Sequence, residues 1–208
     1  MNITLISDTH GYHRNLKRLE GEMIIHAGDI SSKGTLEEVK DFMDWYQKLN
    51  FDYKIFIAGN HDFYFEQASD SEIKALIPDN LIYLNDSGVT INNLNIWGSP
   101  IQPFFLNWAF NKKRGNEIMQ HWKLIPDDTD ILITHGPPLN ILDRTIFGKN
   151  VGCEDLLNKT IQIKPSVHVF GHIHENRGIE DIDETKFINA SLLDEKYKLV
   201  NQPIEIVI

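Results

Sequence analysis

The stretch Val167-His168-Val169-Phe170-Gly171-His172-Ile173-His174 places two histidines, His172 and His174, directly after a short apolar run. Such a run is typical of a buried strand, and in layered α/β folds ligands gather just beyond the carboxyl ends of the strands. A lone histidine near a strand end is more often a hydrogen-bonded structural residue than a ligand. The Gly-His-x-His spacing is much more specific, so this stretch predicts a strand that ends at a site rich in imidazole nitrogen.

Other blocks along the chain have the same organisation, in which an apolar run ends at a polar signal. The runs are Ile3 to Ile6, Met23 to Ile25, Lys54 to Ala58 and Ile131 to Thr134, and the signals after them are Asp8-Thr9-His10, Gly28-Asp29, Gly59-Asn60-His61-Asp62 and Thr134-His135-Gly136. Each block alone is weak evidence, because Asp-x-His is common in capped turns and Asp is a favoured helix N-cap. Together they supply enough oxygen and imidazole donors to hold two divalent cations side by side. The sequence therefore predicts a dinuclear metallohydrolase.

The length and charge of the chain limit its fold and its partners. With 208 residues, we expect residues 1–208 to form a single domain with a sizeable core. The formal net charge of -10 argues against a broad polyanion-binding face, because nucleic-acid affinity comes largely from Lys and Arg that neutralise phosphates. Two bound cations would make the site locally positive, so a small anionic substrate remains compatible with this charge.

Cysteine usage and the N-terminal segment predict a compartment. Cys153 is the only cysteine, which excludes an intrachain disulfide and hence a disulfide-stabilised secreted scaffold. The chain passes from Met1 straight into the Ile3 to Ile6 run and Asp8, which leaves no room for a signal peptide. No other stretch reaches the apolar length of a membrane helix. We therefore expect a cytoplasmic protein that has no membrane segment.

Helical stretches lie between the expected strands. The clearest is Thr35 to Leu49, where Thr35 and Glu38 have the spacing of a capping box. Gly115 to Trp122 and Glu154 to Ile163 are further helix candidates.

The sequence pattern changes in Val89 to Trp97, where apolar and polar residues alternate. The alternation is broken at Asn92-Asn93, which indicates a hairpin. Lys186 to Ala190 and Ile204 to Ile208 indicate further strands, whereas the Pro- and aromatic-rich segment Ser99 to Asn111 is not expected to be regular throughout. These strands and helices predict an α/β (α+β) fold of mixed sheets with the helices outside.

Two of the oxygen donors have distinct chemistry. Asp29 has two carboxylate oxygens and is the residue type able to bridge both metals. Asn60 offers a neutral amide oxygen, which fills a coordination site without adding negative charge and leaves the metal more electrophilic. The remaining histidines lack this grouping, and we predict structural roles for them: His13, His26, His121 and His168.

The blocks, in this order, resemble the motif of the calcineurin-like metallophosphoesterase superfamily: Asp-x-His, Gly-Asp, Gly-Asn-His-Asp/Glu, His and Gly-His-x-His. The resemblance spans nearly the whole chain, from Asp8 to His174. Further stretches look like the MPPED branch, which groups with class III cyclic nucleotide phosphodiesterases: Tyr53-Lys54-Ile55, Ala58-Gly59-Asn60-His61, Thr134-His135-Gly136-Pro137-Pro138, Val151-Gly152-Cys153 and Val167 to Gly171. The resemblance implies the metallophosphoesterase fold, a four-layer αββα sandwich of two mixed sheets flanked by helices.

Carried over residue by residue, the resemblance implies two sets of metal ligands that share one carboxylate. The first set is Asp8, His10, Asp29 and His174, and the second is Asp29, Asn60, His135 and His172. A hydroxide that bridges the two metals would attack phosphorus in line. His61 would then contact the phosphate or protonate the leaving oxygen.

The chain departs from the phosphoprotein phosphatases of the superfamily, which carry Gly-Asp-x-x-Asp-Arg-Gly and Arg-Gly-Asn-His-Glu. Here the differing positions are Ser32, Lys33 and Ala58. Two arginines that bind phosphate in those phosphatases are absent here. This absence disfavours a phosphorylated protein as the substrate, because Lys33 is a point charge and cannot donate the two parallel hydrogen bonds of an arginine. The Asp that is absent at Ser32 would orient the catalytic histidine, and the sequence does not decide whether Asp62 compensates. His61 and Asp62 are the candidate catalytic residues.

Candidate substrate-binding residues are Asn60, His61 and Arg114. Arg114 follows the aromatic segment Pro103 to Phe110, which could form a lip above the metals and stack a nucleobase. We favour the simpler interpretation that these rings pack the loop onto the domain or form an oligomer contact.

The favoured function is that of a metal-dependent phosphodiesterase for small phosphodiesters, with cyclic nucleotides the leading class by resemblance. The two ions could be manganese, iron or zinc, since mixed oxygen and imidazole ligands suit all three. One alternative is a protein-interaction scaffold of the same fold that has lost catalysis, although every expected ligand type is present. The other is a nuclease, which the acidic charge disfavours apart from the group Lys112, Lys113 and Arg114. No oligomeric state is predicted.

Overall fold

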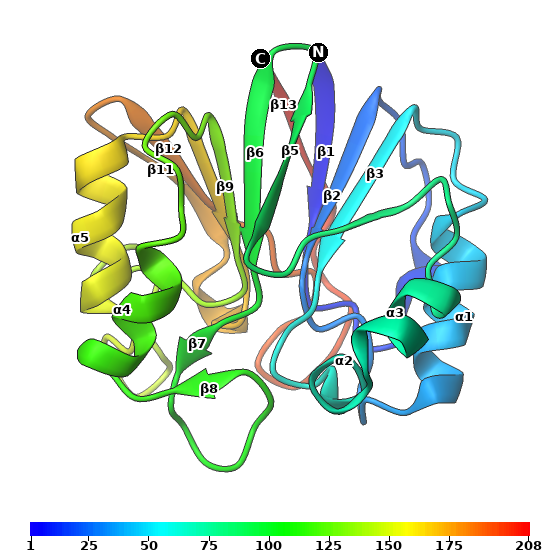
Figure 1. Ribbon diagram of the computed structural model, residues 1–208, viewed down its shortest axis with the longest axis horizontal. Coiled ribbons are helices and arrows are strands. Elements are labelled where there is room, and N and C mark those ends of the chain that lie inside the picture. Colours follow the sequence, from blue (N-terminus) through cyan, green and yellow to red (C-terminus); the bar gives the residue numbers. More distant parts are fainter.

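Two large mixed β-sheets lie face to face in the computed structural model, which describes residues 1–208 (Figure 1). The first sheet has the strand order β13-β1-β2-β3-β4 and the second the order β11-β12-β10-β9-β6-β5. The first consists of β1 (Asn2–Ile6), β2 (Met23–Ala27), β3 (Tyr53–Ile57), β4 (Ile82–Tyr83) and β13 (Ile204–Val207). The second consists of β5 (Ser87–Ile91), β6 (Leu94–Ser99), β9 (Ile131–Thr134), β10 (Val167–Phe170), β11 (Gly178–Ile182) and β12 (Thr185–Asn189). A small separate pair is formed by β7 (Gln102–Pro103) and β8 (Asn111–Lys112).

Helices flank both sheets on their outer sides (Figure 1). They are α1 (Leu36–Tyr46), α2 (Phe63–Gln67) and α3 (Asp70–Leu76) on the first sheet, α4 (Asn116–Trp122) and α5 (Glu154–Ile163) on the second, and 3-10 turns at His13–Asn15 and His174–Asn176. The predicted capping box is present, because the Thr35 side chain accepts from the Glu38 amide and the Glu38 carboxylate accepts from the Thr35 amide. The predicted four-layer sandwich is confirmed.

Strand alternation directs one set of apolar side chains into the space between the sheets. Ile3 and Leu5 of β1 belong to the same buried cluster as Ile133 of β9 and Val169 of β10. Each side chain is at most 1% exposed, and burial of one such side chain contributes about 1.5–3 kcal/mol. The inner faces of the two sheets are therefore held together by an apolar layer.

The opposite faces pack against helices. Ile24 of β2 and Phe56 of β3 lie in one buried cluster with Phe42 and Tyr46 of α1. The hydroxyl of Tyr46 donates to the carbonyl oxygens of Ile24 at 3.1 Å and Ile55 at 2.8 Å, so this buried polar group is satisfied. Helix α1 is thereby fixed to the strands that lead into the polar blocks.

Parallel pairing brings the carboxyl ends of the central strands to one edge of the sheets. In the first sheet β1 pairs in parallel with β2, and β2 with β3. In the second sheet β9 pairs in parallel with β6 and β10, and β10 with β12. The loops that carry the polar blocks therefore meet at the edge that is lowest in Figure 1.

Most predicted elements are present, with a few differences. The predicted hairpin is formed by β5 and β6, and its turn residues Asn92 and Asn93 have φ of 50° and 65°, as a type I′ turn requires. The segment from Ser99 to Asn111 is mostly irregular but contributes the short pair of β7 and β8. The elements α2, α3, β4 and β11 were not predicted from the sequence. None of the helices combines the length and apolar character needed to cross a membrane.

Candidate metal centre

The loops at this edge hold several polar residues in an unusual backbone conformation. Asp8, His10, Asp29 and His172 have φ of 54°, 40°, 56° and 69°. Residues other than glycine adopt this region at a cost of about 1–3 kcal/mol each, which persists only where the surrounding structure enforces it. The Asp8 amide donates to the carbonyl oxygen of Gly28 at 3.0 Å, and the His10 amide donates to that of Asp29 at 3.0 Å. The loop after β1 is therefore tied to the loop after β2.

One cluster of donor atoms forms around His10. Its Nε2 lies 3.4 Å from Nε2 of His174 and 3.5 Å from Oδ2 of Asp29. The same nitrogen is 4.0 Å from Oδ1 of Asp8, which lies 3.2 Å from Nε2 of His174. All four side chains are buried. The structure thus brings together the residues predicted to hold one cation.

A second cluster forms around the side-chain oxygen of Asn60. This oxygen lies 2.7 Å from Nδ1 of His172 and 2.9 Å from Nε2 of His135. Nε2 of His135 also lies 3.3 Å from Oδ2 of Asp29. These are the residues predicted to hold the other cation.

A single carboxylate oxygen, Oδ2 of Asp29, borders both clusters through His10 at 3.5 Å and His135 at 3.3 Å. The other oxygen, Oδ1, accepts from the His61 amide at 2.8 Å. Ligand atoms bound about 2.0–2.2 Å from one cation lie about 3.0–3.6 Å from one another, which matches most of these separations. Asp29 therefore has the position expected of a bridging carboxylate.

Hydrogen bonds on the far side of two imidazole rings determine which nitrogen faces the site. Nδ1 of His135 lies 3.0 Å from the carbonyl oxygen of Ala27, and Nδ1 of His174 lies 3.1 Å from that of Asp194. A carbonyl only accepts, so the proton of each neutral ring is on Nδ1 and the Nε2 lone pair faces the site. The lone pair of His135 then faces Oδ2 of Asp29, which is also an acceptor. Such opposed acceptors need a cation or a proton between them, so the donor set fits a metal.

The pKa values show how these charges respond to one another. Burial opposes protonation of His135 and His174, but Asp29 raises the pKa of His135 to about 9 and Asp8 raises the pKa of His174 to about 9. Burial would raise the pKa of each carboxyl group, yet His174 holds the pKa of Asp8 well below its usual value. His135 does the same to the pKa of Asp29. Protons on two rings thus balance two carboxylates, and bound cations would replace these protons.

Asp8 is held by residues that the sequence analysis missed. Ser191 Oγ donates to Oδ2 of Asp8 at 2.7 Å, and the His172 amide donates to its two oxygens at 3.2 and 3.0 Å. Oδ1 of Asn189 accepts from Ser191 Oγ at 2.8 Å. Asn189 reaches the site because β12 pairs with β10, and Ser191 because it forms a parallel bridge with Ser7. In the sequence, Asn189 and Ser191 are marked only by their position at the end of an apolar run. Many residues share such a position, so it does not identify these two.

The surroundings of Gly171 explain why a glycine precedes the first histidine of Gly-His-x-His. A Cβ at this position would collide with the carboxylate of Asp8 and with the side chain of Ser7. Only glycine therefore lets the loop after β10 approach the loop after β1 this closely.

Asp62 contacts the loops that carry Asp29 and His61. Its carboxylate accepts from the amides of Gly59 at 2.7 Å, Ser31 at 2.9 Å and Ile30 at 3.2 Å, and from Ser31 Oγ at 2.5 Å. The side chain is fully buried, and burial together with the charge of Asp29 raises the pKa of Asp62 to about 6. These contacts tie the loop after β2 to the loop after β3. They suit a positioning role better than contact with a substrate.

His61 borders the first cluster, where a ring nitrogen lies within 4.8 Å of donor atoms of His10 and Asp29. Its Nδ1 lies 2.8 Å from the backbone carbonyl oxygen of Ser32, so the main chain supplies a partner in place of the absent Asp. The indole of Trp108 packs on the ring, with centroids 4.2 Å apart and an angle of 32° between the planes. The orientation of His61 is therefore restrained from two sides.

The clusters open into a cavity of about 500 Å³, called here the central cavity. Its floor includes Asp29, Asn60, His61, His172 and His174. Its rim includes the exposed apolar side chains of Phe105, Leu106, Ile146 and Phe147. The donor clusters are therefore reached through an apolar opening.

The aromatic segment only partly follows the favoured expectation that its rings pack onto the domain. Phe110 is buried at 6% exposure, and Trp108 packs on His61. Phe104 and Phe105 differ, because they remain 58% and 61% exposed. The β7–β8 connection holds these two rings away from the core.

Arg114 lies outside the central cavity. Two of its nitrogens donate to the carbonyl oxygens of Val151 and Gly152, each at 2.7 Å. Arg114 lines a neighbouring cavity of about 310 Å³, called here the side cavity, which shares His172 with the central cavity. A substrate would meet Arg114 only by extending into this side cavity.

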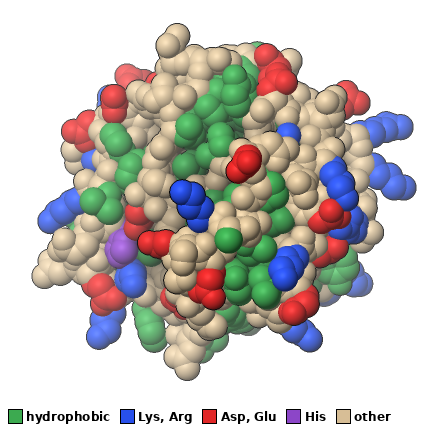
Figure 2. Space-filling model, turned by 45° about the vertical axis from the view of Figure 1, so that its right-hand side comes forward, with side chains coloured by type: hydrophobic (Ala, Val, Ile, Leu, Met, Phe, Trp, Pro, Cys, Tyr) green, Lys and Arg blue, Asp and Glu red, His purple; other side chains and the backbone are tan.

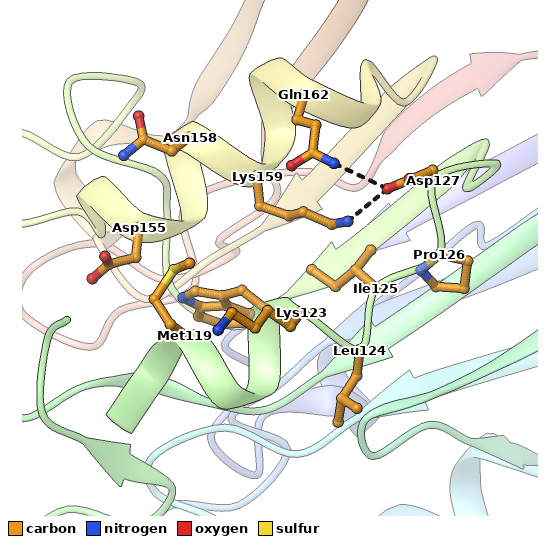
Figure 3. Close-up of a pocket in the computed structure, with 11 residues that line it drawn as sticks. Met119, Lys123, Leu124, Ile125, Pro126, Asp127, Asp155, Asn158, Lys159 and Gln162 are labelled. Carbon is orange, nitrogen blue, oxygen red and sulfur yellow. Dashed lines mark hydrogen bonds and ion pairs between the residues drawn. The ribbon is translucent and has the colours of Figure 1, made fainter. Parts of the chain in front are cut away.

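A third cavity, of about 560 Å³, lies between α4 and α5 and contains none of the predicted ligands (Figure 3). There Lys159 and Gln162 donate to the carboxylate of Asp127 at 2.8 and 3.3 Å. This arrangement is an ion pair between the largely buried side chain of Lys159 and the exposed carboxylate of Asp127.

The histidines predicted to be structural lie outside the donor clusters. His26 contacts Thr9 Oγ1 at 2.9 Å, and His168 contacts Thr134 Oγ1 at 2.8 Å.

The structure thus contains a buried group of carboxylate, amide and imidazole donors, which lies at the carboxyl ends of strands in a four-layer sandwich. A family model described as calcineurin-like phosphoesterase matches residues 1–176. The chain belongs to this family. Metallophosphoesterase domain-containing protein 1 of Homo sapiens is 41% identical over 225 residues, which cover 97% of this chain and 69% of the relative. The predicted superfamily and the likeness to its MPPED branch are confirmed.

A further sequence relative and a solved structure are also similar to this chain. A UPF0046 protein of Caenorhabditis elegans is 35% identical, with 98% of this chain and 74% of the relative covered. The solved structure of phosphopantetheinyl hydrolase from Mycobacterium tuberculosis has a TM-score of 0.67 and 14% identity, and the match covers 94% of this chain and 90% of that chain. At this identity the structural likeness concerns the fold alone.

Proposed function

We propose that this phosphoesterase is a phosphodiesterase that uses two divalent cations to hydrolyse small phosphodiesters. The observation that carries the proposal is the pair of donor clusters that share Oδ2 of Asp29 on the floor of the central cavity. The proposed ligands are Asp8, His10, Asp29 and His174 for one cation and Asp29, Asn60, His135 and His172 for the other. When bound, manganese, iron or zinc would supply a nucleophile at neutral pH and neutralise charge that develops on phosphorus.

We assign the protein's own acid chemistry to His61. Its ring lines the central cavity, and the Ser32 carbonyl and Trp108 restrain it there. From this position His61 would contact the phosphate or donate a proton to the leaving oxygen. Asp62 would hold the loops of Asp29 and His61 in register.

The charge of the central cavity favours a diester over a monoester. Lys149 is the only Lys or Arg that lines this cavity, and Glu175 and Glu195 line it as well. A phosphodiester carries one negative charge, whereas a monoester carries about two at neutral pH, as a phosphorylated side chain does. Cavities that select dianions usually contain an arginine that binds the phosphate through two hydrogen bonds, and no arginine lines this cavity. Cyclic nucleotides are the leading class through the family resemblance.

Paired aryl substrates test this proposal. Metal-loaded protein should hydrolyse bis(4-nitrophenyl) phosphate faster than 4-nitrophenyl phosphate, which releases the same phenolate. Asp29→Ala and His172→Ala should each abolish turnover of the diester. Retained turnover in these variants would contradict the site assignment, and a preference for the monoester would contradict the substrate class.

We also propose that residues 1–208 act as a single cytoplasmic domain, consistent with the free and buried thiol of Cys153. Nucleic acid is not part of the proposal. On the face in Figure 2, Lys and Arg side chains are scattered among Asp and Glu, and no continuous basic stripe crosses that face.

A further inference from the structure

The side cavity adjoins the proposed metal site through shared residues. His172, Phe105, Thr145 and Val151 line both the side cavity and the central cavity. Gly136 and Ile173, which directly follow the predicted ligands His135 and His172, also line the side cavity. A phosphate held at the donor clusters could therefore carry a substituent that lies in this cavity.

The exposed lining of the side cavity is mostly apolar. It includes Pro103, Phe104, Phe105 and Pro137, together with the guanidinium of Arg114. Aromatic rings prefer stacked or edge-on ring partners, and a guanidinium plane stacks on the face of a π-system. This combination suits a planar ring better than a flexible polar chain.

Hydrogen bonds hold these walls in place before any ligand is bound. The bonds to the carbonyl oxygens of Val151 and Gly152 occupy both terminal nitrogens of Arg114, so they limit its ability to grip an anion and fix its plane. The Asn111 side chain donates to the carbonyl oxygens of Phe105 and Leu106, each at 3.1 Å. A wall ordered in advance reduces the entropy lost on binding.

Exposure and volume limit what can fill the side cavity. Phe104 and Phe105 stay 58% and 61% exposed beside it, although the fold buries Phe110 from the same segment. The volume of about 310 Å³ lies at the lower end of the range for small-molecule sites, roughly 300–1,000 Å³. The space therefore suits one ring system and is too small for a macromolecular segment.

We propose that the side cavity binds a planar aromatic substituent of the phosphodiester, either an aryl group or a nucleobase. This inference rests on the proposed function, because it places the phosphate at the donor clusters. It makes Phe104, Arg114 and Asn150 specificity-determining residues, since these three line the side cavity and not the central cavity. It also gives Arg114 a stacking role in place of the predicted contact with phosphate.

Binding of two phosphonates to manganese-loaded protein, measured by calorimetry, tests the proposal. Methylphosphonate and phenylphosphonate carry the same acidic group and a C–P bond in place of the ester, and they differ in the ring. The wild type should bind phenylphosphonate about ten-fold more tightly, which is the order expected for stacking one ring. Phe104→Ala should remove most of this preference, and Asn150→Trp should remove it by filling the cavity.

Phe147→Ala is the matched control. Phe147 is 82% exposed and lines only the central cavity, whereas Phe104 is 58% exposed and lines only the side cavity. The control should keep the ten-fold preference. A preference that is lost in Phe147→Ala and kept in Phe104→Ala would overturn the proposal.

Adenosine monophosphate, titrated in parallel, distinguishes a nucleobase from a simple aryl ring. A gain of either ring-bearing probe over methylphosphonate that Phe104→Ala removes supports the proposal. If methylphosphonate binds and the aryl diester is hydrolysed but no ring-bearing probe gains affinity, the side-cavity proposal fails and the proposed function stands. If no probe binds and no diester is hydrolysed, both fail.

Discussion

Nδ1 of His61 lies 2.8 Å from the backbone carbonyl oxygen of Ser32. The partner is a main-chain atom, so the side chain at this position need not be acidic for the ring to be oriented. The Nδ1–H is then used by this carbonyl, so Nε2 is the nitrogen that faces the substrate, and it would donate a proton to the leaving oxygen from the imidazolium form of the ring. The relationship explains how the chain tolerates Ser32 where related phosphatases have Asp.

Ser32→Ala should therefore leave turnover of an aryl diester within about two-fold of wild type, because the side chain is exposed and forms no hydrogen bond. His61→Ala should lower kcat by about 10²–10⁴-fold, the usual contribution of a positioned acid or base. Steady-state kinetics on both variants makes the comparison. A loss in Ser32→Ala as large as that in His61→Ala would show that the carbonyl does not orient the ring.

Metal content should depend on which cluster is changed. His174→Ala removes a ligand from one cluster and Asn60→Ala removes a ligand from the other, so each variant should lose about one of two bound ions. Asp29→Ala removes the oxygen that borders both clusters and should lose both. Elemental analysis after dialysis measures these losses. One ion retained in Asp29→Ala would argue against a shared carboxylate.

The stability of metal-free protein should fall as the pH rises from about 6.5 to 9. The folded-state pKa values of His135 and His174 are raised from 6.5 to about 9, although burial opposes protonation. Their contribution is fully present below pH 6.5 and is lost as the pH rises through 9. Asp8 and Asp29 have lowered pKa values and act below pH 3.8, outside this window.

Thermal melts in a chelating buffer should therefore show a Tm several degrees lower at pH 9.5 than at pH 6.5, since about 1 kcal/mol shifts Tm by roughly 2–4 °C in a chain of this size. Saturation with manganese should flatten this dependence, because the ions replace the protons. A metal-free Tm that is constant or rises across the window would be inconsistent with protonated His135 and His174.

Asp62→Ala should destabilise the fold by about 3 kcal/mol or more. The change leaves the amides of Gly59, Ser31 and Ile30 without their acceptor, and each unsatisfied buried group costs about 1–3 kcal/mol. Urea denaturation measures the free energy of unfolding. Asp52→Ala, at an exposed carboxylate, is the matched control and should change it by less than about 0.5 kcal/mol.

The milder Asp62→Asn variant separates positioning from catalysis. It keeps one acceptor oxygen, so it should lower kcat while leaving the pH profile of turnover unchanged. A shifted pH profile would instead indicate that Asp62 exchanges protons with the substrate.

Strands and ligand blocks were predictable because both depend on local sequence. The apolar run before Gly171 predicts β10, and the resemblance assigned His172 and His174 to separate cations. In the structure these histidines do lie in separate clusters, beside Asn60 and His10 respectively.

Residues that act through pairing between distant segments were not predictable. Ser191 reaches Asp8 because it forms a parallel bridge with Ser7, and nothing in the sequence near Ser191 records that pairing. The Ser32 carbonyl was missed for a different reason, since a main-chain partner leaves no signature in residue type. The distance of Arg114 from the clusters follows from its bonds to Val151 and Gly152, which are also main-chain contacts.

Anomalous diffraction from crystals loaded with manganese measures the central claim directly. We expect two peaks per chain, about 3.5–4 Å apart, with Oδ2 of Asp29 between them. One peak would lie beside His10 and His174 and the other beside Asn60 and His135. A single peak, or peaks remote from Asp29, would contradict the account.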